Sequence, residues 1–217
     1  MNIIEYPKIN TIWKRESEKP RRIMIGAYSK PEFETVNRWH VTEKIDGTNV
    51  RVIWDGEHIE FRGRTDRANM PTKLMLHLQQ TFTPEKMKEK FSAPVLLFGE
   101  GYGAGIQKGG GDYCADQRFI LFDVLIDGWW LEPENVKGIA QALEIPSVPV
   151  FGCMSTDDAI DLIAFNLETL ISELAATPHA AEGIVCRSAP ALLNRKGERV
   201  MWKLKLKDYA ALGKSNA

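Results

Sequence analysis

The chain has 217 residues, a formal net charge of −1 at pH 7 and 44% hydrophobic residues. This composition is sufficient for a buried core, while the near-neutral charge argues against a protein that coats nucleic acid by bulk electrostatics. No stretch approaches the roughly 20 apolar residues of a membrane span, and the N-terminus has no basic region followed by an apolar run.

The expected elements alternate along the chain between antiparallel hairpins and helices. Residues 50–54 and 58–61 form one predicted hairpin around Asp55-Gly56, and residues 119–126 and 129–131 form another around Asp127-Gly128. The helical segments are expected at 72–80, 85–91, 134–143 and 157–175. Because no repeated β-α-β unit occurs, the pattern favours the α+β class with antiparallel sheets flanked by helices. No repeat or linker interrupts residues 1–217, which are expected to form a single domain.

Lys44 is predicted at the end of a strand over residues 39–43, followed by an Asp46-Gly47 turn. An isolated Lys-x-Asp-Gly most often marks a surface lysine beside a turn. The alternative is a nucleophile whose neutral amine attacks the α-phosphate of a nucleoside triphosphate and forms a phosphoramidate. Because a free lysine has a pKa of about 10.4, this role needs neighbouring cations or burial.

Residues 201–207 alternate strictly between apolar and basic types. As a strand, this segment places Lys203, Lys205 and Lys207 on one face. Same-face neighbours in a strand lie about 7 Å apart, so two ammonium groups could bind adjacent phosphates. The plainer interpretation is an amphipathic strand with a solvated lysine face.

The glycine-dense stretch 98–111 matches neither a Walker A pattern nor a dinucleotide-binding fingerprint. Its glycines are expected to allow close approach of the backbone to a ligand or partner, and to form a mobile loop.

Six short motifs occur in a fixed order from about Thr42 to Lys207. They are Glu43-Lys44-Ile45-Asp46-Gly47-Thr48-Asn49, Phe61-Arg62-Gly63-Arg64-Thr65, Phe98-Gly99-Glu100, Phe119-Ile120-Leu121-Phe122-Asp123, Glu182-Gly183-Ile184-Val185 and Lys203-Leu204-Lys205. This set resembles the covalent nucleotidyltransferase superfamily of ATP-dependent DNA ligases, RNA ligases and mRNA capping enzymes. The segment Gly99 to Lys108 is similar to the RNA ligase 2 family of phage and RNA-editing ligases. The resemblance implies an ATP-grasp-like ligase adenylation domain.

The resemblance also implies a role for individual residues. Lys44 would be the nucleophile, Arg64 would serve strand joining (with Arg62 as the alternative register), and Asn49 would lie near the acceptor end. Glu182 would hold a divalent metal, for which Mg²⁺ is expected and Mn²⁺ is a substitute. Phe122 would stack on adenine, although core packing explains it equally well. The full set expected to bind the nucleotide is Glu43, Glu100, Gln107, Phe122, Glu182, Lys203 and Lys205.

The activity implied is ATP-dependent joining of RNA 3′-OH and 5′-phosphate ends, through lysyl-AMP and an adenylylated 5′ end. A nicked duplex is the expected substrate. Only 12 residues follow Lys205, which is too few for an OB domain or a helical C-terminal domain, and this disfavours a capping enzyme. Only 43 residues precede Lys44, which disfavours an NAD-dependent ligase. Because Asp46 is the form shared with DNA ligases, a minimal DNA nick-sealing ligase remains an alternative. A non-catalytic RNA- or nucleotide-binding relative is the other.

The remaining expectations concern the setting in which the protein works. Three distant cysteines and four scattered histidines favour reduced thiols and no zinc site. We therefore expect a cytoplasmic monomer, or one in the host cytoplasm if the source is viral. A separate RNA-binding protein is a candidate partner, because the sequence shows so little beyond a catalytic core.

Overall fold

The computed structural model describes residues 3–165, 175–176 and 179–213. The chain divides into two compact units. Unit 1 comprises Met1–Pro7, Asp46–Val148 and Leu174–Thr177, and unit 2 comprises Lys8–Ile45, Pro149–Glu173 and Pro178–Ala217. One of the boundaries falls between Ile45 and Asp46, inside the Lys44-x-Asp46-Gly47 motif. Folding of residues 1–217 as a single domain stays a prediction.

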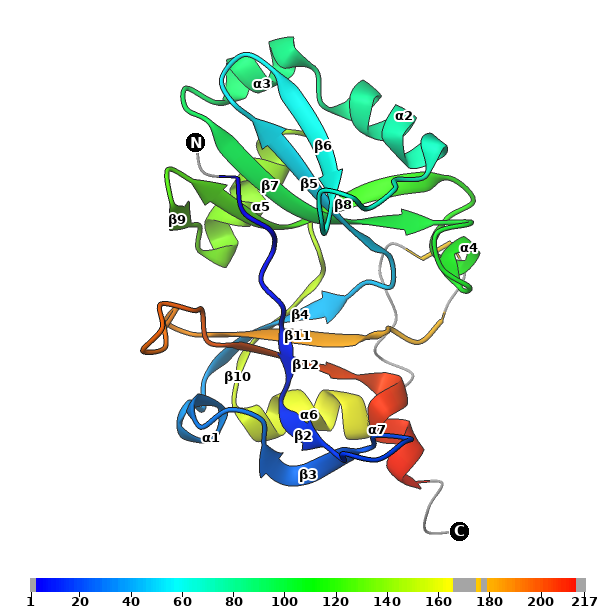
Figure 1. Ribbon diagram of the computed structural model, residues 1–217, viewed down its shortest axis with the longest axis vertical. Coiled ribbons are helices and arrows are strands. Elements are labelled where there is room, and N and C mark those ends of the chain that lie inside the picture. The colour runs from blue at the N-terminus through cyan, green and yellow to red at the C-terminus, as the bar shows by residue number, and fades with distance from the viewer. Residues whose placement is uncertain (1–2, 166–174, 177–178, 214–217) are drawn as a thin grey trace. The chain divides into compact units, whose positions relative to one another are not determined.

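Unit 1 is built on a five-stranded antiparallel sheet (Figure 1). Its strands, in spatial order, are β6 (Ile59–Gly63), β5 (Thr48–Trp54), β7 (Val95–Gly103), β8 (Gln117–Ile126) and β9 (Trp129–Trp130). Both predicted hairpins, β5–β6 and β8–β9, are confirmed. In the β8–β9 turn Asp127 and Gly128 have φ angles of 49° and 82°, the positive values that a tight two-residue hairpin requires.

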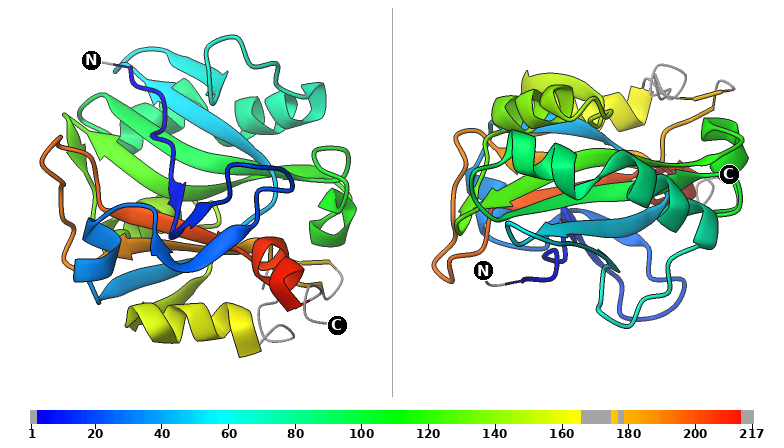
Figure 2. Two further views of the ribbon diagram at one scale, coloured as in Figure 1. Left: turned by 60° about the horizontal axis from the view of Figure 1, so that its bottom comes forward. Right: turned by 90° about the horizontal axis from the view of Figure 1, so that it is seen from above.

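Helices α2 (Thr72–Thr81), α3 (Pro84–Lys90) and α5 (Pro133–Ala142) pack against one face of this sheet (Figure 2). They match three of the predicted helices to within two residues. Helix α3 begins where expected because the Thr83 hydroxyl accepts a hydrogen bond from the Lys86 amide and Pro84 occupies the first helical position. The shared core is apolar and includes Leu74, Leu78, Met87, Phe119 and Val136.

Only the middle of the glycine-dense stretch, residues 104–109, is a loop, so the prediction of a loop over the whole stretch was wrong at its two ends. Its first part, through Gly103, belongs to strand β7, and its last part forms the short helix α4 (Gly110–Tyr113). Close packing explains the glycine at position 99: a Cβ atom there would lie 2.2 Å from carbons of the Phe119 ring. The glycine therefore makes room for a neighbouring aromatic side chain.

Unit 2 contains a second five-stranded sheet, ordered β1 (Asn10–Thr11), β12 (Met201–Lys205), β11 (Gly183–Ser188), β4 (Trp39–Lys44) and β10 (Val150–Met154). A separate pair joins β2 (Trp13–Arg15) to β3 (Ile23–Tyr28), and α1 (Glu32–Thr35) follows β3. Helix α6 (Thr156–Phe165) packs along the five-stranded sheet (Figure 2). The core of the unit includes Trp39 and Trp202, whose ring centroids lie 5.5 Å apart.

Two predicted elements of unit 2 end differently from expectation. The helix predicted over 157–175 is described as α6 up to Phe165, and residues 166–174 lie outside the described residues. The alternating strand stops at Lys205, and helix α7 (Leu206–Gly213) begins at the next residue. Lys207 is therefore exposed on a helix and does not share the strand face with Lys203 and Lys205, which corrects the prediction. In the helix, Leu206 and Tyr209 both pack against the core of unit 2, whereas a continued strand would place Tyr209 on the opposite face from Leu206.

No helix in the described part of the chain is both long enough and apolar enough to cross a membrane.

Candidate functional site

Sheet register in unit 2 brings the two ends of the sequence motif set together. On β11, Gly183 pairs with Lys44 of β4 on one side and with Lys205 of β12 on the other. Glu182, the residue before β11, thus lies between two lysines that are 161 positions apart in the sequence (205 − 44). Gly183 has no room for a side chain, because a Cβ atom would lie 2.1 Å from the Leu204 carbonyl oxygen.

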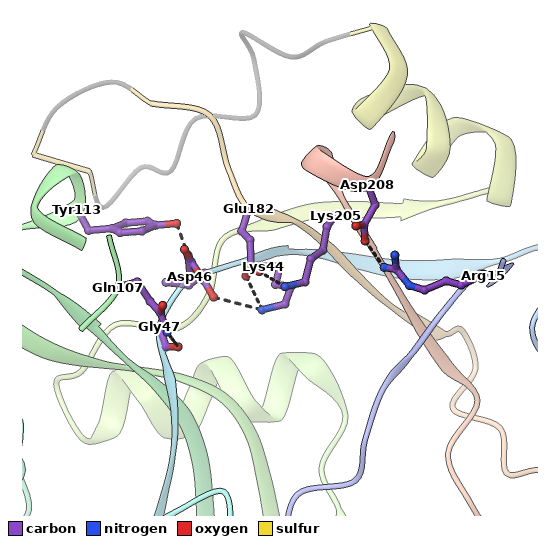
Figure 3. Close-up of polar contacts among 10 residues, drawn as sticks. Arg15, Lys44, Asp46, Gly47, Gln107, Tyr113, Glu182, Lys205 and Asp208 are labelled. Carbon is purple, nitrogen blue, oxygen red and sulfur yellow. Dashed lines mark hydrogen bonds and ion pairs between the residues drawn. The ribbon is translucent and has the colours of Figure 1, made fainter. Parts of the chain in front are cut away.

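One carboxylate holds both lysines (Figure 3). The Lys44 Nζ donates to Glu182 Oε2 at 2.5 Å, and the Lys205 Nζ donates to Glu182 Oε1. The Glu182 side chain is only 8% exposed, against 20% for Lys44 and 24% for Lys205. Burial by itself would raise the pKa of the Glu182 carboxyl, but the Lys44 charge and the hydrogen bonds from both lysines outweigh it and lower that pKa. The cluster therefore carries a net positive charge in partly water-excluded surroundings.

This arrangement defines what the cluster can do. An ammonium group has no free electron pair, so Lys44 could attack an electrophile only after losing a proton. Lys205 then remains as a cation next to the reacting centre. Such a cation can stabilise negative charge that develops on a phosphate.

Glu182 is also chemically suited to a hard divalent cation, which prefers carboxylate, phosphate and water oxygens. In the described residues there is no cluster of three or more His, Cys, Asp or Glu side chains that could hold a metal ion. A divalent ion at Glu182 would therefore depend on phosphate and water for most of its ligands, and one lysine contact with Glu182 would have to give way.

The other expected residues of unit 2 lie on β4 and β12. Lys203 is half-buried on β12, with the neighbouring Trp202 and Leu204 completely buried, as the alternating pattern predicted. Glu43 is 2% exposed and its amide donates to the Pro149 carbonyl oxygen at 2.9 Å. Strand alternation places its carboxylate on the opposite face of β4 from the Lys44 side chain.

In unit 1, three expected residues gather around Gly47. The Gln107 side-chain amide donates to the Gly47 carbonyl oxygen at 2.9 Å (Figure 3). Glu100 on β7 pairs with Asn49 on β5, and a Cβ atom at Gly47 would lie 2.7 Å from the Glu100 Cγ. The backbone is equally close, because the same Cβ would lie 2.2 Å from the Gly101 carbonyl oxygen. Only glycine fits here, and the turn after Lys44 can therefore lie directly against β7.

Asn49 carries an unsatisfied group within this cluster. Its Oδ1 atom is buried and has no hydrogen-bond partner among the described residues. A buried acceptor without a partner costs about 1–3 kcal/mol. Such an atom marks a position where a bound donor, such as a hydroxyl group, would be favourable.

A β-bulge sets the position of Phe122. Phe98 pairs with Asp123 and the next residue, Gly99, pairs with Leu121, so Phe122 is the extra residue on β8. It remains half-exposed while both of its neighbours are buried. The Tyr6 ring lies edge-on to it at 4.9 Å, and the Tyr6 hydroxyl donates to Asp123 Oδ2 at 2.8 Å. The ring is thus held by its neighbours while part of it stays accessible, as bulges near functional sites often achieve.

The structure does not bring Arg64 into the Gly47 cluster. It follows β6 and is exposed, with no hydrogen bond or ion pair from its side chain to another described residue. Arg62, the alternative register, forms ion pairs with Glu60 and Asp66. The segment after β6 is anchored by Arg51, which is 1% exposed and donates to the Gly63 carbonyl oxygen at 2.9 Å and to Asp66 Oδ1 at 2.7 Å.

Three residues near these positions were not identified from the sequence. They are Tyr6, Arg51 and Tyr113, whose hydroxyl accepts a hydrogen bond from the Asp46 amide at 3.3 Å. Arg51 had a detectable signal, since it is the one charged residue in the apolar run 50–54. Tyr6 and Tyr113 lie outside every motif and had none.

A family model described as RNA ligase matches residues 37–205 of the chain. Among solved structures, a mutant RNA ligase of Naegleria gruberi with ATP and Mn superposes with a TM-score of 0.64 at 18% identity, covering 95% of this chain and 61% of that one. Another mutant of that ligase, with AMP and Mn, superposes with a TM-score of 0.61 at 18% identity and covers 84% of this chain and 54% of that one. An archaeal ATP-dependent RNA ligase superposes with a TM-score of 0.65 at 17% identity and covers 97% of this chain and 50% of that one. No curated protein sequence matches the chain.

These matches confirm the expected fold, that of a ligase nucleotidyltransferase domain. The chain spans between 50% and 61% of the length of the solved ligases that it resembles. At identities below 20%, the structural likeness establishes the fold and leaves the roles of individual residues as predictions.

Replacing Gly47 with alanine should destabilise unit 1, because the added methyl group meets backbone atoms that cannot move aside. We expect Gly47→Ala to lower the free energy of unfolding by about 1–3 kcal/mol, as overpacking typically does. The matched control is Gly138→Ala at an exposed position of helix α5, where a Cβ atom meets nothing within 4 Å. The control should raise stability by about 0.5–1 kcal/mol. Equal stabilities of both variants in urea unfolding would contradict the close approach at Gly47.

Proposed function

This chain belongs to the RNA ligase family, and we propose that it joins RNA 3′-OH and 5′-phosphate ends through a covalent adduct of AMP on Lys44. The observation that carries the proposal is the pairing of Lys44 and Lys205 with one buried carboxylate, Glu182. A surface lysine beside a turn would need no such partners. A nucleophile that acts on a polyanionic phosphate needs both a means of losing its proton and a cation nearby.

In the first step of the proposed reaction, the Lys44 nitrogen attacks the α-phosphorus of ATP. A P–N bond forms, the P–O bond to the β-phosphate breaks, and pyrophosphate leaves. The Lys44 ammonium must first lose one proton to solvent, so that the neutral amine has a free electron pair. Lys205 and Lys203 then counter the charge on the phosphate oxygens.

A divalent ion, for which Mg²⁺ is expected and Mn²⁺ is a substitute, would be held by Glu182 and would supply charge neutralisation at the phosphates when bound. The presence of Mn with ATP or AMP in the similar Naegleria gruberi structures supports this choice.

We assign the adenosine part of the nucleotide to the residues of unit 1. Glu100 and Gln107 lie at Gly47 and offer polar groups for the ribose and base. Phe122 presents a half-exposed ring of the kind on which a base stacks. Glu43 completes the proposed nucleotide-binding set by its position next to the nucleophile.

The remaining steps transfer AMP and seal the ends. The 5′-phosphate of one strand attacks the Lys44 adduct, so the P–N bond breaks and an adenylylated 5′ end forms. The 3′-OH of the other strand then attacks that 5′-phosphate, a phosphodiester forms, and AMP leaves. Arg64 and Asn49 are the residues proposed for these steps, and the unpaired Oδ1 of Asn49 supports a hydroxyl contact. The substrate is proposed to be a nicked RNA duplex, and the working form a monomer in the cytoplasm.

A minimal DNA nick-sealing ligase is the second candidate, and the observation in its favour is Asp46, the residue form shared with DNA ligases. A non-catalytic relative is disfavoured by the retention of Lys44, Glu100, Glu182, Lys203 and Lys205 together.

The proposal predicts which nucleotide labels the protein. With Mg²⁺, α-labelled ATP should leave a label that survives denaturing electrophoresis and is released by acid, as a phosphoramidate is. GTP and NAD should leave none, since the motif set resembles ATP-dependent ligases. Labelling by GTP at a comparable rate would overturn the assignment to this branch.

The two lysines of β12 should matter for labelling by ATP. Lys203→Ala and Lys205→Ala each remove a cation assigned to the phosphates, and each should slow labelling by about 10²–10³-fold, the typical effect of losing one stabilising group. Lys207→Ala is the matched control, because Lys207 is exposed on α7. The rates should be compared at equal fractions of folded protein, measured by circular dichroism. Normal labelling by both inner variants would show that this lysine face is merely solvated.

The choice between RNA and DNA should depend on the sugar at the 3′-OH side of the nick, since the 2′-hydroxyl is the group that distinguishes them. We expect ribose to be required there, while the strand with the 5′-phosphate can be either. Sealing of a pre-adenylylated nick should be faster than sealing from ATP. The measurement compares the rates at which the protein seals nicked duplexes that differ only in the terminal 3′ sugar, at one fixed salt concentration. Equal or faster sealing of the all-deoxy nick would favour the DNA ligase alternative.

A further inference from the structure

Unit 1 contains a groove that none of the residues proposed for catalysis lines. It has a volume of about 800 Å³ and lies between helix α2 and the segment at the start of β8. This volume falls within the range of about 300–1,000 Å³ that is typical of ligand sites. One wall consists of Lys73, Leu76, His77 and Gln80, which recur at the three- and four-residue spacing of a single helix face. These side chains lie on the side of α2 away from the core residues Leu74 and Leu78.

The opposite wall is formed mainly by Asp116, Gln117 and Arg118. Lys73 and Arg118 are both exposed, and neither side chain forms a hydrogen bond or ion pair with another described residue. Asp116 is the one carboxylate among the groove's lining residues. Burial lowers the pKa of the His77 imidazole and the Arg118 charge lowers it further, while the Asp116 charge opposes both effects. The groove thus has two available cations in a protein whose overall charge is −1.

The groove is connected to the Gly47 cluster by a short chain of contacts. The Gln117 side-chain amide donates to the Ala104 carbonyl oxygen at 2.9 Å, and its Oε1 accepts from the Leu74 amide of α2 at 3.0 Å. Ala104 forms a β-bridge with Gln107, whose side chain contacts Gly47. One residue of the groove therefore fixes both the helix that forms its wall and the segment that carries Gln107.

From this geometry we propose that the groove binds the sugar–phosphate backbone of an RNA strand whose end is being joined, with Lys73 and Arg118 as the phosphate contacts. This assignment rests on the proposed ligase function. It adds a substrate-binding surface outside the residues that carry out the chemistry.

The features of the groove favour a polynucleotide over an acidic peptide. Its cations stand on opposite walls, as expected for a chain of phosphates that passes between them. Amide, imidazole and apolar groups (Gln80, His77 and Leu76) also line the groove, where they can contact sugars and bases. A phosphate-binding role also explains why two exposed cations line one groove and neither forms an ion pair with a described acidic residue.

The test is a salt titration of RNA binding. Binding of a fluorescently labelled, 5′-phosphorylated single-stranded RNA would be measured by anisotropy at several salt concentrations, without ATP. The double variant Lys73→Glu/Arg118→Glu should bind more weakly, and its plot of log affinity against log salt should be shallower by about 1.4, because each phosphate contact on a single strand contributes about 0.7. The matched control is Lys88→Glu/Lys137→Glu, which makes the same change in net charge at exposed positions of α3 and α5 outside the groove.

Labelling of each protein with ATP separates this inference from the function on which it rests. We expect the groove variant to be labelled at the wild-type rate, because its substitutions lie outside the nucleotide set. If wild-type protein is labelled and binds RNA, but the groove and control variants have equal affinities and slopes, the groove assignment fails while the proposed function stands. The groove assignment would also be overturned if wild-type protein that is labelled by ATP did not bind the RNA. Displacement of the RNA from wild-type protein, but not from the groove variant, by polyglutamate at comparable concentrations would assign the groove to acidic peptides instead.

Discussion

The candidate site of unit 2 depends on one buried carboxylate that is shared by two lysines. Glu182 keeps Lys44 and Lys205 within a few ångströms of each other, although two ammonium groups alone would repel. Its pKa is held low by those same cations in spite of burial, so the carboxylate stays charged and the cluster stays assembled. Removing this negative charge would leave two partly buried cations without compensation, which is costly. Local stability and the resting state of the proposed nucleophile are therefore set by one interaction.

In unit 1 the corresponding constraint is steric. The backbone of the turn after Lys44 lies so close to β7 that position 47 cannot carry a side chain. Glu100, Gln107 and Asn49 are consequently grouped around main-chain atoms, whose positions are fixed by the sheet. The chain passes from one unit to the other between Ile45 and Asp46, so four consecutive residues belong partly to the lysine cluster and partly to the Gly47 cluster.

Much of this organisation could be predicted from local sequence patterns. Asp-Gly turns between two strand-like segments predicted both hairpins. The apolar–basic alternation over 201–205 predicted the strand face on which Lys203 and Lys205 lie. The predicted position of Lys207 was wrong, because the apolar–basic alternation of the sequence continues after the backbone has turned into helix α7. In that helix Leu206 packs on the core. The bulge at Phe122, the Tyr6–Asp123 hydrogen bond and the groove beside α2 depend on contacts between distant segments, which no local pattern encodes.

The central claim is that Lys44 becomes covalently linked to AMP. The most direct measurement is intact mass spectrometry of the protein after incubation with ATP and Mg²⁺, followed by proteolysis and fragmentation of the modified peptide under non-acidic conditions. Our account predicts a mass gain of one AMP per chain, located on Lys44, reversed by pyrophosphate and absent from Lys44→Ala. An adduct on another residue, or none with either Mg²⁺ or Mn²⁺, would contradict it.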